Sequence, residues 1–344
     1  METRLLGETG LEVSVLSFGT MTFGGQGRFG HMGSAGVQEA TEAVDLCLDA
    51  GINLFDSADV YSGGMSEEIL GKALGSRRDS VLVATKLHGR MGEGPNDLGQ
   101  SRHHIVRACE ASLRRLGTDY IDLYQIHGVD ELTPWEESLR ALDDLVRAGK
   151  VRYIGCSNLS AWHLMQALAT SDRRNLERFA SLQAYYSLVA RELEHELVPL
   201  CIDQGVGILV WSPLAAGFLS GKYRRGQEQV EGTRIAALGT PGTIDTEQGF
   251  DVVDALDDIA KQRGASVAQV ALNWLLRKRG VTSVIIGARN RDQLVDNLAA
   301  ANWELTADEV RRLDQVSERP LPYPYWHQRK FNLERLRPDL HDLG

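Results

Sequence analysis

The chain has 344 residues, of which 43 % are apolar and 24 % charged, and its formal net charge is −10. This balance is typical of a globular protein with a sizeable core, and the lack of any basic tract argues against nucleic acid as a partner. The polar N-terminus does not resemble a secretory signal, no apolar run is long enough to span a bilayer, and the four cysteines form no CxxC pair, so we expect a cytoplasmic protein with no membrane partner.

The first half of the chain alternates short apolar runs with segments of helical spacing. A predicted hairpin around residues 7–10 comes first. Runs typical of strands follow at 15–19, 52–56, 81–86, 121–127 and 151–158. Segments with helical apolar spacing lie between and after these runs, at 37–50, 66–74, 101–116, 134–148 and 161–169. Gly51, Gly117 and Gly149 stand at or just after the ends of three of these helices, where glycine commonly ends a helix.

The second half continues the same alternation. Strands are predicted at 181–186, 207–211 and 283–287, and helices at 194–204, 252–263, 267–277 and 291–300. The eight strand-like runs are mostly continuously apolar, as expected for strands buried on both faces of a parallel sheet. Eight such units fit one (β/α)8 TIM barrel domain over residues 1–344. A doubly wound open sheet is the alternative, but no Pro/Gly-rich linker divides the chain.

Two stretches fall outside the repeat. One covers residues 221–249 and is rich in glycine and threonine. The other is the tail from about Glu318, which carries the sequence PLPYPYW. We expect this C-terminal tail to lie over the barrel mouth, although its aromatic residues suit packing on the barrel surface as well.

Polar side chains stand where the predicted strands end, which is where barrels of this kind carry their chemistry. Asp56 ends the second strand and Tyr61 lies in the loop beyond it, Lys86 ends the third strand, and His127 ends the fourth. Each residue alone has a structural explanation, such as a turn cap, a solvated strand end or a core histidine. Together at strand ends they indicate an active site.

These four residue types suit proton donation to a carbonyl. A tyrosine has an unperturbed pKa of about 10, so it needs a neighbour that favours its anion, and a lysine ammonium does this by Coulomb attraction. Asp56 is expected to keep Lys86 charged, and His127 to donate a hydrogen bond that orients the substrate carbonyl. None of the four supplies a hydride, so a nicotinamide cofactor is implied.

The chain resembles the aldo-keto reductase family in segments that cover nearly its whole length. These segments are GINLFDSADVYSGGMSEEILGKAL, VLVATK, DLYQIH, YIGCSN, LVWSPLAAGFLSGKY and SVIIGARNRDQLVDNL. The resemblance implies a (β/α)8 barrel that binds NADPH across its mouth. It also implies a catalytic tetrad of Asp56, Tyr61, Lys86 and His127, in which Tyr61 is the general acid.

The resemblance also implies the cofactor site. Ser157, Asn158 and Gln183 match residues that hold the nicotinamide carboxamide, and Trp211 matches the aromatic residue that stacks on the ring. The pyrophosphate loop corresponds to Ser212, Leu214, Gly217 and Leu219, with Lys222 and Arg234 as charged contacts. The adenosine end corresponds to Gly287, Arg289, Gln293 and Asn297, and the loop under the cofactor to Thr20 and Met21, with Asp56 beside it. The planar fork of Arg289 suits a 2′-phosphate, so NADP(H) is expected over NAD(H).

Two other functions compete with a reductase. The potassium-channel β subunits resemble the chain in the same motifs and offer an NADP(H)-binding regulatory or redox-sensing subunit, but they lack the histidine at the position of His127. A metal-dependent barrel isomerase or lyase needs several carboxylates and histidines around one ion, whereas the strand ends offer one carboxylate, so no metal is expected.

The physiological substrate stays open. It is expected to be a small aldehyde, ketone or sugar-like molecule, selected by aromatic residues of the loops and the tail. The candidates are Phe23, Phe29, Trp135, Tyr323, Tyr325 and Trp326. The sequence leaves the oligomeric state open as well.

Overall fold

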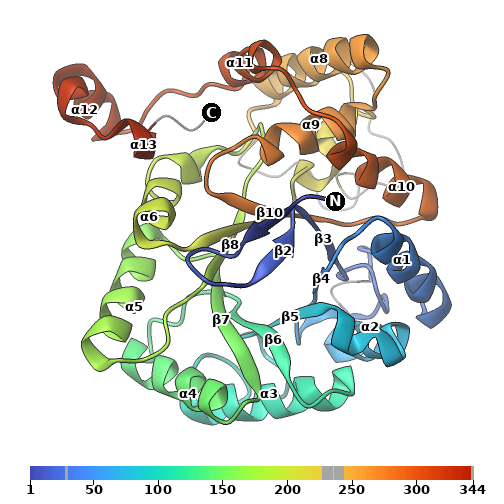
Figure 1. The fold of residues 1–344 in the computed structure, drawn as a ribbon, viewed down its shortest axis with the longest axis vertical. Helices are drawn as coiled ribbons and strands as arrows, with labels where there is room; N and C mark the ends of the chain where they lie inside the picture. Colours follow the sequence, from blue (N-terminus) through green and yellow to red (C-terminus); the bar gives the residue numbers. More distant parts are fainter. Residues whose placement is uncertain (28–29, 227–234, 236–243, 342–344) are drawn as a thin grey trace.

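The barrel predicted from the sequence is present in the computed structural model, which describes residues 1–27, 30–226, 235 and 244–341. In this part of the chain eight parallel strands close a barrel in the order β10-β3-β4-β5-β6-β7-β8-β9 (Figure 1). The strands are β3 Leu16–Gly19, β4 Leu54–Asp56, β5 Leu82–Leu87, β6 Ile121–Ile126, β7 Val151–Ser157, β8 Ser181–Tyr185, β9 Gly207–Trp211 and β10 Val281–Ile286. The (β/α)8 TIM barrel is therefore confirmed.

Helices surround the barrel and cover the outer faces of its strands (Figure 1). They are α1 Val37–Asp49, α2 Met65–Leu74, α3 Arg102–Leu116, α4 Trp135–Arg147, α5 Ala161–Arg174, α6 Leu197–Gln204, α8 Thr246–Arg263, α9 Val267–Leu276, α10 Arg291–Ala299 and α11 Ala307–Val316. Helix α4 illustrates why they pack here, because its Leu139, Leu142 and Leu145 recur every three residues and are all buried.

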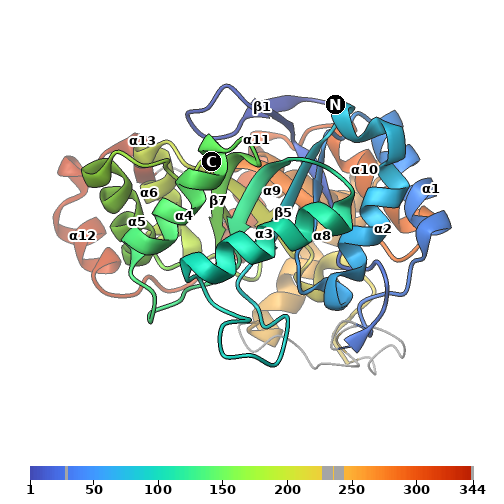
Figure 2. The same cartoon turned by 90° about the horizontal axis from the view of Figure 1, so that it is seen from below.

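The predicted N-terminal hairpin is also confirmed, and it lies across one end of the barrel. Strands β1 (Thr3–Leu5) and β2 (Glu12–Ser14) pair antiparallel, and Figure 2 shows them on the opposite side of the molecule from the long loops that follow the strands. Leu6 and Val13 of this hairpin are fully buried and pack with inward-facing residues such as Leu54 and Leu123. The hairpin therefore closes the N-terminal end of the barrel.

The position of the C-terminal tail differs from the expectation that it covers the mouth. Arg319 still reaches the loop after β8, where its guanidinium donates to the Val189 carbonyl at 3.1 Å. Beyond it, α12 (Tyr325–Phe331) protrudes outside the barrel, and α13 (Pro338–His341) packs against α6 (Figures 1 and 2). The Tyr325 ring stacks on His195 with centroids 5.3 Å apart, and Arg337 forms an ion pair with Asp203 at 3.0 Å. These aromatic and ionic contacts hold the tail on the outer side of the barrel.

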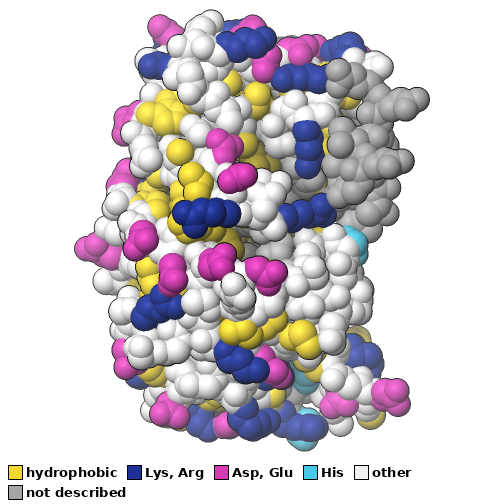
Figure 3. All heavy atoms as spheres, turned by 90° about the vertical axis from the view of Figure 1, so that its right-hand side faces the viewer, with side chains coloured by type: hydrophobic (Ala, Val, Ile, Leu, Met, Phe, Trp, Pro, Cys, Tyr) yellow, Lys and Arg dark blue, Asp and Glu magenta, His cyan; other side chains and the backbone are white. Residues whose placement is uncertain are grey.

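The surface over α1, α2 and α10 carries charges of both signs, interspersed among neutral groups (Figure 3). The acidic net charge of the chain is thus not gathered into one continuous patch on this face. Within the described ranges, no helix combines the length and the apolar character needed to cross a membrane.

Candidate active site

The ends of neighbouring strands bring Asp56, Lys86 and Tyr61 into direct contact. The Lys86 ammonium donates to the Asp56 carboxylate at 2.5 Å, to the Ser57 carbonyl at 2.8 Å and to the Tyr61 hydroxyl at 3.4 Å. Lys86 is completely buried, Asp56 is 3 % exposed and Tyr61 is 9 % exposed. An ion pair out of contact with water is screened far less than one at the surface, so each charge here acts strongly on its neighbours.

The loop that carries Tyr61 is fastened to the next strand. The amide of Ser57 donates to the Ala84 carbonyl at 2.8 Å, and the amide of Asp59 donates to the Lys86 carbonyl at 3.0 Å. Ser62 then adopts a positive φ of 50°, and its hydroxyl donates to the Phe23 carbonyl at 2.9 Å. These bonds fix the turn, so that the Tyr61 hydroxyl meets Lys86.

His127 follows β6 directly and lies beside Tyr61. Its amide donates to the Leu87 carbonyl at 2.8 Å, which extends the pairing of β6 with β5 by one residue. The His127 and Tyr61 rings meet edge to face, with centroids 5.8 Å apart and an angle of 76°. The structure therefore brings all four predicted catalytic residues to one place at the mouth of the barrel.

Burial controls the protonation of Tyr61 more than its lysine neighbour does. Burial raises the pKa of the Tyr61 phenol, and the Lys86 charge opposes this without overcoming it. Burial alone lowers the pKa of Lys86, but the Asp56 charge and Tyr61 raise it above the ordinary value. The site thus holds a neutral phenol and a charged ammonium at neutral pH. The expectation that Lys86 would favour the tyrosine anion is correct in sign, although burial outweighs it.

Gln125 is a contact of Asp56 that the sequence analysis missed. Its side-chain amide is buried in β6 and donates to the second carboxylate oxygen of Asp56 at 3.1 Å. Gln183 donates to the same oxygen at 2.9 Å. Alternation along β6 was the available signal, because Leu123 faces the barrel interior, and Gln125 and His127 follow it at intervals of two.

Asp59 is a second missed residue, two positions before Tyr61. Its side chain is completely buried. Burial and, to a smaller extent, the Glu67 carboxylate raise the pKa of Asp59 to about 8, against the opposing charge of Arg115. The carboxyl of Asp59 is therefore mostly protonated at neutral pH, and it adds little negative charge beside Lys86.

Several predicted cofactor residues lie together at the ends of β7 and β9. The Trp211 indole donates to the Asn158 side-chain oxygen at 3.0 Å, and its ring stacks on Tyr185 with centroids 4.8 Å apart. Asn158 and Ser212 hold φ values of 57° and 52°, which non-glycine residues seldom adopt. Backbone held in this way is common at functional sites.

Ser157, another predicted cofactor residue, has an unsatisfied side chain in the described part of the chain. Its hydroxyl oxygen is buried and has no hydrogen-bond partner among the described residues. An unsatisfied buried hydroxyl costs free energy, so its presence beside Asn158 fits a site completed by a polar ligand such as a carboxamide.

The remaining predicted contacts form two groups at the mouth, one in the loop after β9 and one in the loop after β10 together with α10. The first contains Leu214, Gly217, Leu219 and Lys222, where Gly217 has a φ of 91° and a side chain there would crowd the Lys222 ammonium. In the second, the Arg289 amide donates to the Gln293 side chain at 3.0 Å, and Asn297 donates to the Gly287 carbonyl at 3.2 Å. Arg234 lies outside the described residues.

Thr20 and Met21 lie in the loop after β3, the strand that pairs with β10 on one side and β4 on the other. The Thr20 hydroxyl is buried and lies 2.8 Å from the Ser66 hydroxyl, while its amide donates to the Asp56 carbonyl at 2.9 Å. Met21 packs with Tyr61 and Met91. Thr20 thus supports the backbone of Asp56, and Met21 contributes apolar surface next to Tyr61.

Among the residues that the structure describes, no three histidine, cysteine, aspartate or glutamate side chains gather as ligands of a metal ion would. The charged groups at the strand ends instead pair with one another, as in the contact of Lys86 with Asp56.

Comparison with known proteins places most of the chain in the family that the sequence motifs indicated. Residues 15–318 match the model of the Aldo/keto reductase family. A Bacillus subtilis protein named uncharacterized oxidoreductase YrpG is 38 % identical, covering 93 % of this chain and 97 % of its own length. Versiconal hemiacetal acetate reductase of Aspergillus parasiticus is 35 % identical, and the match covers 92 % of this chain and 96 % of the relative. A probable voltage-gated potassium channel subunit beta of Oryza sativa subsp. japonica is 39 % identical, and the match again covers 92 % of this chain and 96 % of the relative. The chain belongs to the aldo/keto reductase family of oxidoreductases.

Proposed function

We propose that the protein reduces the carbonyl of a small aldehyde, ketone or sugar-like substrate to an alcohol with NADPH, in a reversible reaction. The observation that supports this most is the Lys86 ammonium, which contacts both the Asp56 carboxylate and the Tyr61 hydroxyl. The His127 ring lies against Tyr61 and adds a donor at the same place. Donors arranged in this way can stabilise the negative charge that develops on a carbonyl oxygen during reduction.

The four side chains have distinct parts in this proposal. The bound nicotinamide supplies the hydride. The Tyr61 hydroxyl donates its proton to the carbonyl oxygen, and the Lys86 ammonium stabilises the phenolate that remains. Asp56 keeps Lys86 charged in its buried position, and His127 donates a hydrogen bond that orients the carbonyl. Gln125 and Gln183 in turn hold Asp56 through its second oxygen.

The cofactor is proposed to bind along the mouth from β7 to β10. Ser157, Asn158 and Gln183 would hold the carboxamide, and Trp211 would stack on the ring through the face not covered by Tyr185. The unsatisfied Ser157 hydroxyl supports this assignment. The backbone around Gly217, with Lys222 and Arg234, would bind the pyrophosphate.

A carbonyl-reduction assay tests the proposal directly. Purified protein should oxidise NADPH, followed by its absorbance, when mixed with at least one class in a panel of aldehydes, ketones and sugars. The relatives named as potassium channel β subunits supply the second candidate, a regulatory subunit that binds NADP(H) with little turnover. Tight NADPH binding without turnover across the panel would favour that candidate.

Arg289 is proposed to select NADPH over NADH. In the structure its guanidinium donates to the His31 carbonyl at 3.1 Å, which places it at the loop between β3 and α1. Arg289→Ala should weaken NADPH binding by about 1.5–3 kcal/mol, because a hydrogen bond to a charged group is lost. NADH, which lacks the 2′-phosphate, is the control and should lose little affinity. Fluorescence titration with both cofactors checks this, and equal losses would place Arg289 elsewhere.

A further inference from the structure

Exposed apolar side chains concentrate on one side of the molecule. Twelve large apolar residues are exposed in the described chain, and seven of them belong to two segments. Leu132, Trp162 and Met165 lie on and near α5, and the others lie in the C-terminal arm, which we define as residues 320–341. These are Tyr323, Trp326, Phe331 and Leu333. Because the arm packs along α6 and α6 neighbours α5, both segments occupy the same side (Figure 1).

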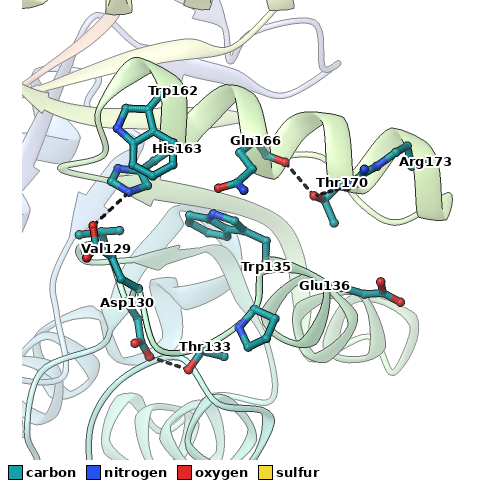
Figure 4. A pocket seen from close by; sticks show the side chains of 12 residues that line it. Val129, Asp130, Thr133, Trp135, Glu136, Trp162, His163, Gln166, Thr170 and Arg173 are labelled. Atoms are coloured by element: carbon teal, nitrogen blue, oxygen red, sulfur yellow. Dashed lines mark hydrogen bonds and ion pairs between the residues drawn. The ribbon is translucent and has the colours of Figure 1, made fainter.

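The first segment surrounds a groove between α4 and α5. Its volume is about 590 Å³, and Trp135 from α4 and Trp162 from α5 line it (Figure 4). The Trp162 ring is 60 % exposed and lies against His163 with centroids 3.6 Å apart. A ring supported in this way on one face presents its other face to a partner, and exposed aromatic rings beside a hollow are typical of interaction sites.

The charged groups of this groove are mainly acidic. Asp130, Glu131 and Glu136 line it together with Arg173. Glu136 also pairs with Arg140 and Arg174, which leaves Asp130 and Glu131 as the carboxylates that the groove offers to a partner. The Glu131 side chain is 72 % exposed and lies 3.6 Å from the His163 ring nitrogen. The groove therefore combines aromatic surface with a carboxylate open to a basic partner.

The arm protrudes and carries basic side chains, in contrast to the hollow, acidic groove. Helix α12 protrudes from the body, and none of its residues is buried. The rings of Tyr323 and Trp326 are 6.4 Å apart, and those of His327 and Phe331 are 4.6 Å apart, so the arm carries a continuous aromatic surface. Arg329 and Lys330 lie between these rings in the sequence, on a chain whose net charge is −10.

We propose that the arm of one copy binds the α4–α5 groove of a second copy. The arm is protruding, basic and aromatic, while the groove is hollow, acidic and aromatic, so the two surfaces are complementary. Both lie on one side of the chain, which lets a single two-fold rotation place each arm on the groove of the other copy. The result is a closed dimer in which the same contact forms twice. This inference does not depend on the proposed reaction.

Sedimentation velocity and light scattering on the full chain test the proposal. The unmodified protein should be a dimer at micromolar concentration. Phe331→Asp in the arm and Trp162→Glu in the groove should each weaken dimerisation by on the order of 30-fold or more, as expected when an aromatic anchor is lost. Val295→Asp is the matched control, because Val295 is an exposed apolar residue on α10, away from both segments, and this variant should stay dimeric.

Mixing the two weakened variants distinguishes arm exchange from other dimers. In a mixed pair, the intact arm of the Trp162→Glu chain meets the intact groove of the Phe331→Asp chain. The mixture should therefore associate more tightly than either variant alone, as one contact is restored. An unmodified protein that is monomeric at tens of micromolar, a dimer that withstands both substitutions, or a mixture without recovery would each overturn the proposal.

Discussion

Tyr61→Phe is expected to lower the rate of hydride transfer to a carbonyl by on the order of a hundred- to ten-thousand-fold, the usual contribution of a positioned general acid. The substitution removes only the hydroxyl that contacts Lys86 at 3.4 Å. Lys86 keeps its bonds to Asp56 and to the Ser57 carbonyl, so the surrounding charges stay in place. Single-turnover transfer from pre-bound NADPH is the measurement.

Two controls separate chemistry from binding and folding in this variant. NADPH affinity should be nearly unchanged, because the Tyr61 hydroxyl is proposed to act on the substrate and not on the cofactor. Tyr120→Phe removes a surface hydroxyl that bonds to Asp79 and should leave the rate unchanged. If Tyr61→Phe retains the unmodified rate, another group donates the proton.

His127→Asn should slow the same step by about a hundred- to a thousand-fold, the typical effect of losing one donor to a developing oxyanion. The His127 ring adjoins the Tyr61 ring, so both groups can reach one carbonyl oxygen. Cofactor affinity, measured separately by fluorescence quenching, should stay normal because Trp211, Asn158 and Gln183 are untouched.

His103→Asn is the matched control for this substitution, since His103 is an exposed histidine on α3. It should leave hydride transfer unchanged. Slow transfer with normal affinity in His127→Asn supports the reductase assignment. Unchanged transfer would make His127 a core histidine and would strengthen the second candidate, the regulatory subunit.

The barrel was predictable because its signals are local. The continuous apolar run of β9 and the glycine that ends α3 at residue 117, with a φ of 64°, reveal buried strands and helix ends directly. Helix α11 carried a comparable signal, the capping box of Thr306 and Glu309, which the sequence analysis did not use. Helix α8 begins at Thr246, before its predicted start, because the Asp245 side chain accepts from two amides of its first turn.

Features that depend on distant contacts were harder to predict. The tail was placed wrongly because its position depends on His195 and Asp203, more than a hundred residues earlier in the chain. Gln125 was missed because its importance comes from Asp56 across the barrel. That Asp56, Lys86 and His127 lie together could be predicted because strand ends meet at one mouth whatever the details of packing.

The closure of the barrel has a consequence for how the chain folds. Strand β3 pairs with β10, which joins Leu16 to Val284, and the Arg4 guanidinium donates to the carbonyls of Leu276 and Val281. Such contacts close a very long loop, and their entropic cost makes them late steps of folding. During synthesis, β3 cannot pair with β10 until that last strand has been made. An incomplete barrel exposes unpaired strand edges, which favour aggregation. The mouth that carries Asp56 and Lys86 is therefore complete only after nearly the whole chain has been made.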